Sequence, residues 1–99
     1  MPKHNQIPSK LIICGKQYRV MRKDLGCEEN IIHYGSTNHP QQKIEVSSKT
    51  KIEQQKETLL HEIIHVISEG YQIGLRERQI KTLANGLYDT MKRNRYRVW

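Results

Sequence analysis

Residues 58–67 of this 99-residue chain are Thr-Leu-Leu-His-Glu-Ile-Ile-His-Val-Ile, and this stretch decides the fold. Its apolar residues continue a series that starts at Ile52 and recurs at intervals of three and four positions. This period is typical of an amphipathic helix that buries one face. We therefore predict a helix over residues 51–68. The spacing of Thr50 and Glu53 also predicts a capping box at its start.

A second amphipathic pattern follows the glycine-containing turn at residues 70–74. We predict a helix that begins near Glu77 and ends near Arg93. Its apolar residues form one stripe, which is expected to be buried; they are Ile80, Leu83, Ala84, Leu87, Tyr88 and Met91. Gly86 within this helix costs about 1 kcal/mol relative to alanine, and we expect close packing against another helix to explain its presence.

In the first half of the chain, apolar residues alternate with polar ones, which is typical of strands with one solvated face. Residues 11–21 predict a hairpin of two short strands that turns near Gly15. A third strand is predicted within residues 27–34, closed by turn-forming residues at 35–40, and a fourth at residues 43–46. The order is therefore four strands followed by two helices.

These patterns predict an α+β fold, with a small antiparallel sheet of three to four strands packed against two helices. We expect a single domain over residues 1–99 with flexible ends at 1–10 and 94–99. The apolar share of 35% is low for a globular domain, so a metal or self-association is expected to add stability. No apolar run is long enough to span a membrane, and no secretion signal is found. We therefore expect a cytoplasmic chain without membrane contact, in which the thiols of Cys14 and Cys27 are reduced.

The first predicted helix contains the pattern H-E-x-x-H, from His61 to His65. Residues four apart lie about 6 Å along a helix axis and roughly 40° around it, so both imidazoles reach one metal ion. Glu62 lies beside this pair, where its carboxylate meets a water on the metal without binding the metal itself. That is the position of a general base. Imidazole and carboxylate ligands indicate zinc first, with other divalent ions as alternatives.

A zinc site of this kind needs a third protein ligand, and distance along the helices favours Glu77. Glu69 continues the face of the two histidines, but it lies about 12 Å along the axis from His61, too far to share one ion. Asp89 lies three turns beyond the start of the second helix and is the least favoured. Glu77 begins that helix three residues before the apolar stripe, so it can face back toward the first helix.

The two predicted helices resemble the minimal zinc metallopeptidases of the ImmA/IrrE type, especially small phage-encoded members. In that family, H-E-x-x-H is followed by a helix of the pattern E-x-x-A-x-x-F-A-x-x-L. The five positions of this pattern hold Glu77, Ile80, Leu83, Ala84 and Leu87. The resemblance implies a zincin-like fold, Zn2+ bound by His61, His65 and Glu77, and Glu62 as the base that activates a zinc-bound water. It also implies a phage- or mobile-element-encoded hydrolase that cleaves a protein substrate in the host cytoplasm.

Other residues near these helices have weaker claims to a role. Three tyrosines are candidates for the donor that stabilises an oxyanion, although a core or surface role is favoured for each; they are Tyr34, Tyr71 and Tyr88. Glu57, one turn before His61, is a candidate acceptor that orients this imidazole, but a solvated glutamate is favoured. Three further histidines lie in loop-like segments and are given no role; they are His4, His33 and His39.

The formal net charge is +7, and residues 92–99 hold four cations and no carboxylate. An alternative function is therefore a metal-stapled, non-catalytic binding protein that acts on nucleic acid or on a host protein. Nucleic acid binding through this basic tail is not favoured, because cations are common after a helix carboxyl terminus and no nucleic-acid motif is present. The sequence leaves the substrate, the cleavage site and the oligomeric state open.

Overall fold

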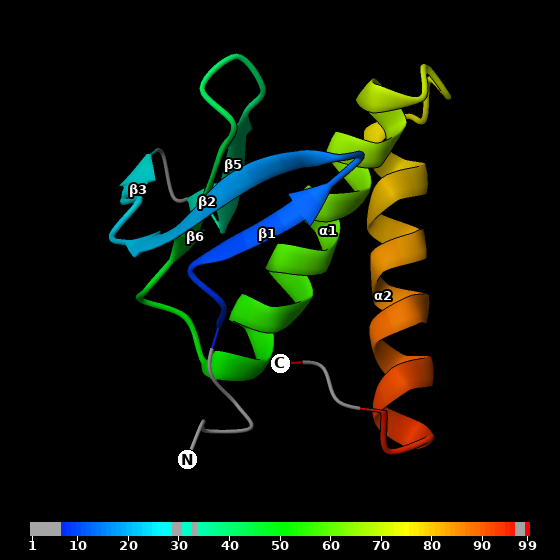
Figure 1. Cartoon of the computed structure of the whole chain (residues 1–99). Coiled ribbons are helices and arrows are strands. Elements are labelled where there is room, and N and C mark those ends of the chain that lie inside the picture. The colour runs from blue at the N-terminus through cyan, green and yellow to red at the C-terminus, as the bar shows by residue number, and fades with distance from the viewer. Residues whose placement is uncertain (1–6, 29–30, 33, 97–98) are drawn as a thin grey trace.

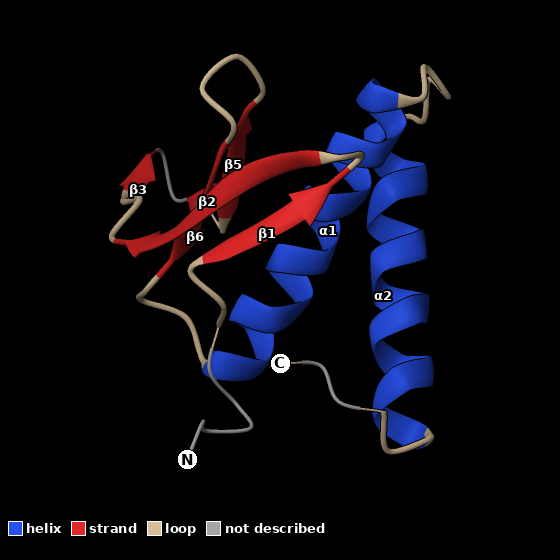
Figure 2. Ribbon diagram, in the orientation of Figure 1, coloured by secondary structure: helices blue, strands red, loops and turns tan. Residues whose placement is uncertain are grey.

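The structure, a computed structural model, describes residues 7–28, 31–32, 34–96 and 99. In chain order, its elements are β1 (Lys10–Ile13), β2 (Lys16–Lys23), β3 (Cys27–Glu28), β4 (Ile31–Ile32), β5 (Gly35–Asn38), β6 (Lys43–Ser47), α1 (Ile52–Gly70) and α2 (Glu77–Arg93). The strands β1, β2, β6 and β5 form one sheet, α1 packs against it, and α2 packs against α1 (Figure 1, Figure 2). The predicted α+β class with two helices is confirmed.

The predicted hairpin is formed by β1 and β2, which pair antiparallel from Lys10↔Arg19 to Ile13↔Lys16. The two residues between the strands, Cys14 and Gly15, have φ values of 53° and 75°. Two successive positive φ values match the twist of paired strands, which is why such a short turn closes the hairpin here.

The sheet is mixed, whereas the sequence predicted an antiparallel one. The order is β1-β2-β6-β5, and β2 and β6 run parallel, from Arg19↔Lys43 to Lys23↔Ser47. A parallel pair requires the chain to travel back along the sheet between its strands. β5 makes this return, because it runs antiparallel to β6 on the outer edge.

The prediction of a turn over residues 35–40 is wrong for its first four residues, which form β5. Glycine, serine and asparagine favour turns locally, but pairing with β6 from Gly35↔Val46 to Asn38↔Lys43 outweighs this preference. The turn itself follows at residues 39–42, where the Gln42 amide donates to the His39 carbonyl at 3.1 Å. The strand predicted within residues 27–34 is present as the short pair β3 and β4, apart from the main sheet.

The core lies between the inner face of the sheet and α1. Its buried members are Ile13, Tyr18, Val20, Ile44, Val46, Leu59 and Val66. A second, smaller cluster between α1 and α2 is built on Leu60 and Ala84. The sheet, α1 and α2 are thus successive layers, and α1 is buried on two sides.

The start of α1 differs from the prediction, because the expected capping box does not form. The helix begins at Ile52, and Lys51 is its cap without a side-chain hydrogen bond. The Thr50 hydroxyl instead donates to the Ser47 carbonyl at 3.2 Å, within the turn that leads out of β6. The carbonyl of Thr50 accepts from the side chain of buried Gln55 at 2.8 Å, which ties the first turn of the helix to this loop.

The predicted bounds of α2 are confirmed, but only part of its apolar stripe is buried. Ile80 and Ala84 are 1% and 0% exposed, whereas Leu83 and Leu87 are 50% and 45% exposed. The reason is that α2 packs against α1 alone and therefore buries a narrow stripe. The expectation of close packing at Gly86 is wrong, since a Cβ there would meet no atom within 4 Å.

The expected flexible ends fall partly outside the described residues, which omit residues 1–6 and 97–98. Ile7 is half-buried against the main core, and the Ser9 carbonyl accepts from the Val20 amide at 2.8 Å. At the other end, Trp99 packs against both core clusters. In the described residues, neither helix has the length and hydropathy to cross a membrane.

Candidate metal centre

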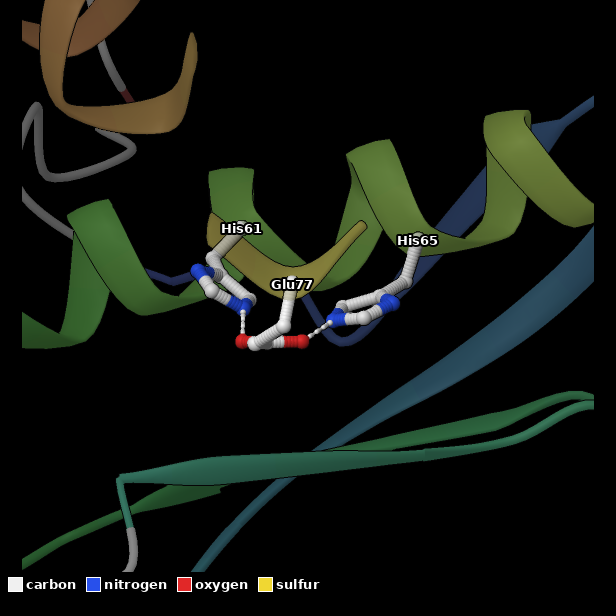
Figure 3. A group of neighbouring side chains, drawn as sticks. All are labelled: His61, His65 and Glu77. Carbon is white, nitrogen blue, oxygen red and sulfur yellow. Dashed lines mark ion pairs between the residues drawn. The ribbon is translucent and has the colours of Figure 1, made fainter. Parts of the chain in front are cut away.

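Three side chains predicted as metal ligands meet at one point between the helices. His61 and His65 project from successive turns of α1, with ring centroids 4.9 Å apart. The carboxylate of Glu77, the first residue of α2, lies between the two rings (Figure 3). Its Oε1 is 2.6 Å from Nε2 of His61, and its Oε2 is 2.7 Å from Nε2 of His65.

The position of Glu77 follows from how the turn between the helices is held. Ser68, buried near the end of α1, accepts at its carbonyl from the Ile73 amide at 2.9 Å. The Ser68 hydroxyl accepts from the Leu75 amide at 3.0 Å. These bonds fold the turn back over the helix end, and Ile80 then packs α2 against α1. Glu77, three residues earlier, is thereby directed at the histidine face.

The donor set fits a zinc ion. Two imidazole nitrogens and one carboxylate are the ligands of many catalytic zinc sites, and one ligand atom from each side chain lies within 4.8 Å of the others. Zinc bonds of about 2.0–2.1 Å place tetrahedral donors about 3.3 Å apart. The two contacts of Glu77 are shorter than this, at 2.6 and 2.7 Å, and the three ligand atoms lie within 4.8 Å of one another, so rotations of the side chains would bring all three donors around one ion. Among the described residues, these three form the one group of histidine, cysteine, aspartate or glutamate side chains that is large and close enough to hold an ion.

The two carboxylates that were less favoured as ligands lie elsewhere. Asp89 accepts two bonds from the Arg93 guanidinium at 3.0 and 2.9 Å, one turn further along α2. Glu69 is exposed and lines a separate cavity of about 430 Å³ on the far side of His65. The structure therefore brings together the three residues favoured from sequence, and neither Asp89 nor Glu69 belongs to this group.

Glu62 is 7% exposed and is held by β5. The Thr37 hydroxyl donates to Glu62 Oε1 at 2.7 Å. Gly35, two residues earlier on the same face of β5, lies so close to α1 that a Cβ would be 2.6 Å from Thr58 Cγ2 and 3.4 Å from Glu62 Oε2. Sequence reasoning missed both β5 residues because it assigned them to a turn. The sequence of β5 held no local signal of a strand, because its glycine, serine, threonine and asparagine show no alternation of apolar and polar residues.

Glu62, both histidines and Glu77 line one cavity of about 620 Å³ between α1, α2 and β5. Glu57 also lines it, but among the described residues the His61 ring donates no hydrogen bond to its carboxylate. On the opposite wall, Lys81 follows one turn after Glu77 on α2. Charged side chains therefore line the cavity on both its α1 side and its α2 side, next to His61, His65 and Glu77.

Of the three tyrosines considered as oxyanion donors, only Tyr34 lines this cavity. Tyr71 is 68% exposed beyond the end of α1. The Tyr88 hydroxyl donates to Glu53 near the start of α1, and this bond lowers the pKa of Glu53. Burial, together with the same bond, raises the pKa of Tyr88. Tyr88 therefore joins the two helices away from the donors.

β5 borders the cavity through Gly35 and is the last strand of the described sheet. The Tyr34 carbonyl accepts from the Ser47 amide at 2.8 Å, and in an antiparallel pair such bonds involve every second residue. The backbone groups of residues 34, 36 and 38 are therefore directed at β6. Those of Gly35 and Thr37 point to the other edge, which pairs with no strand in the described residues.

We predict that Gly35→Ala lowers the free energy of unfolding by about 1–3 kcal/mol, because its Cβ forces Thr58 or the strand to move. The matched control is Gly86→Ala, where the added Cβ meets open space on α2. This control should raise stability by about 0.5–1 kcal/mol, since alanine favours helix more than glycine does. Urea unfolding measures both. Equal effects of the two substitutions would contradict close contact between β5 and α1.

No protein-family model, curated protein or solved structure matches this chain.

Proposed function

We propose that this protein is a zinc-dependent metallopeptidase that hydrolyses a peptide bond in a protein substrate. The observation that carries the proposal is the convergence of His61, His65 and Glu77 in one cavity with the buried carboxylate of Glu62. Three donors alone would suit a structural metal. A fourth side chain beside them, the carboxylate of Glu62, is held by β5 rather than by the donors, and hydrolysis requires such a group in addition.

The residues divide into metal-holding and proton-handling groups. His61, His65 and Glu77 would hold the ion, which when bound polarises a carbonyl and acidifies water. Glu62 takes a proton from the attacking water as the new C–O bond forms. It then gives that proton to the nitrogen of the scissile bond, so the C–N bond breaks with a neutral amine as leaving group.

The substrate would bind as an extended strand along the open edge of β5. There the backbone groups of Gly35 and Thr37 supply donors and acceptors to a peptide, as in other cases of strand addition. The side chain of Thr37 meanwhile holds Glu62. One residue thus links the position of the peptide to that of the base. We also infer a cytoplasmic site of action, where Cys14 remains a free thiol.

The test of this function is metal-dependent cleavage of a peptide library. Zinc-loaded protein is incubated with peptides from a digested proteome, and new amino termini are identified by mass spectrometry. Cleavage should cease when the metal is removed by a chelator and return when zinc is restored. Loss of zinc without any effect on new termini would contradict the proposal. A His39→Ala variant, altered outside the cavity, should behave like the parent protein.

We expect Thr37→Val to lower kcat about tenfold with little change in KM. Valine has nearly the shape of threonine but leaves Glu62 Oε1 without its donor, and a hydrogen bond to a charged group is worth about 1.5 kcal/mol or more. Thr37→Ser keeps the hydroxyl and should retain most activity. Steady-state kinetics on a cleaved library peptide measures the three proteins. Equal kcat values for valine and serine would show that the hydroxyl does not position the base.

A further inference from the structure

The face of the sheet turned away from α1 carries a row of three cations. Lys10 on β1 lies opposite Arg19 on β2, and Arg19 lies opposite Lys43 on β6. Tyr18, Val20 and Ile44, which alternate with them, are buried on the inner face. The three cations therefore share the outer face, where β1 and β2 pass in front of α1 (Figure 1).

The charges of this row are poorly compensated. Like charges directly opposite one another destabilise a strand pair. In the described main sheet, this face has a single carboxylate, that of Glu45. Its Oε2 is 2.9 Å from Nζ of Lys23 and 3.9 Å from Nζ of Lys43. The hydrogen bond from Lys23 is the main cause of the lowered pKa of Glu45. Neither Lys10 nor Arg19 has a carboxylate partner among the described residues.

Exposed apolar side chains flank the row on both sides. Ile12, two residues after Lys10 on β1, is 77% exposed. Met21, two residues after Arg19 on β2, is 41% exposed. Because β1 and β2 are antiparallel, these two side chains lie on opposite sides of the row, each about 7 Å from it. The outer face therefore has a cationic centre with an apolar contact on either side.

We propose that this outer face binds single-stranded nucleic acid, as an activity separate from the cavity on the helical side. Phosphates would lie along Lys10, Arg19 and Lys43, with sugars and bases against Ile12 and Met21. Neighbouring strands are about 4.8 Å apart, so three cations fall within about 10 Å. A nucleic acid strand carries one phosphate per nucleotide, so successive phosphates come within reach of these long, flexible cationic side chains.

An acidic peptide and a duplex fit this face less well. An acidic peptide supplies carboxylates to the cations, but it brings no flat apolar group beside each charge, whereas each nucleotide brings a sugar and a base toward Ile12 and Met21. A duplex keeps its bases stacked and out of reach of Ile12 and Met21. Binding to a single strand should be weak, tolerant of sequence and sensitive to salt, because phosphate contacts supply most of it.

The experiment uses fluorescence anisotropy with a labelled oligothymidylate of about 12 nucleotides, titrated with the full chain at several salt concentrations. We expect a Kd of about 10⁻⁶–10⁻⁴ M. Arg19→Glu should weaken binding at least tenfold and flatten the salt dependence by about 0.7 per lost phosphate contact. The matched control, Arg95→Glu, makes the same charge change in the basic tail and should alter Kd less than twofold.

The stability of Arg19→Glu separates lost binding from misfolding. A glutamate between Lys10 and Lys43 replaces repulsion by attraction, so this variant should unfold at a higher urea concentration than the parent. A lower midpoint together with weaker binding would overturn the proposal, as would equal loss in Arg95→Glu. Displacement of the oligonucleotide by polyglutamate at equal charge would assign the face to an acidic protein. Equal affinity for a duplex of the same length would also overturn it.

Discussion

Replacing Glu62 by glutamine should lower the proposed peptide cleavage by a factor of about 10²–10⁴ and leave zinc binding intact. The amide keeps the shape of the side chain and still accepts a hydrogen bond from the Thr37 hydroxyl, so the contact with β5 survives. It cannot take a proton from water at neutral pH. Library cleavage and zinc content, both measured on the same preparation, check the two halves of this prediction.

Glu57→Gln is the matched control for this change. Glu57 lines the same cavity one turn before His61, so the substitution removes the same charge from the same surroundings. We expect cleavage to change less than threefold. A similar loss in both variants would mean that negative charge in the cavity matters rather than proton transfer by Glu62. Unchanged cleavage in Glu62→Gln would remove this residue as the base.

The helices were predictable from sequence because their signal is local. A run of apolar residues at intervals of three and four depends only on neighbours along the chain. This pattern predicted a helix over residues 51–68, where α1 spans Ile52–Gly70, and it predicted the observed bounds of α2. The face shared by His61 and His65 follows from the same period. The position of Glu77 required one further inference, namely that α2 runs back along α1 after the turn between the two helices.

β5 could not be predicted in this way, since its pairing is not local. Gly35–Asn38 has the composition of a turn and becomes a strand only because β6 pairs with it and α1 packs on it. The contact between Thr37 and Glu62 joins residues 25 positions apart. The parallel pairing of β2 with β6 has the same origin, because the direction of β6 depends on where β5 makes its return.

Replacing Glu77 by alanine should weaken zinc binding by more than about 100-fold. Loss of a residue that only orients a ligand already weakens binding by about 10–100-fold, and Glu77 itself contacts both imidazoles at 2.6 and 2.7 Å. The side chain is 66% exposed, so its removal should disturb the metal-free fold little. Affinity is measured by competition with a chelating dye.

The stability of the folded state gives an independent measure of this loss. At a zinc concentration 100 times the Kd of the parent protein, binding stabilises the fold by about 2.7 kcal/mol. A variant whose Kd is 100-fold weaker gains only about 0.4 kcal/mol under the same conditions. Glu69→Ala, which removes an exposed carboxylate near the same end of α1, should keep the full gain. If Glu69→Ala lost the gain and Glu77→Ala kept it, the metal would lie along α1 alone. The cavity between the helices would then not be the reaction site.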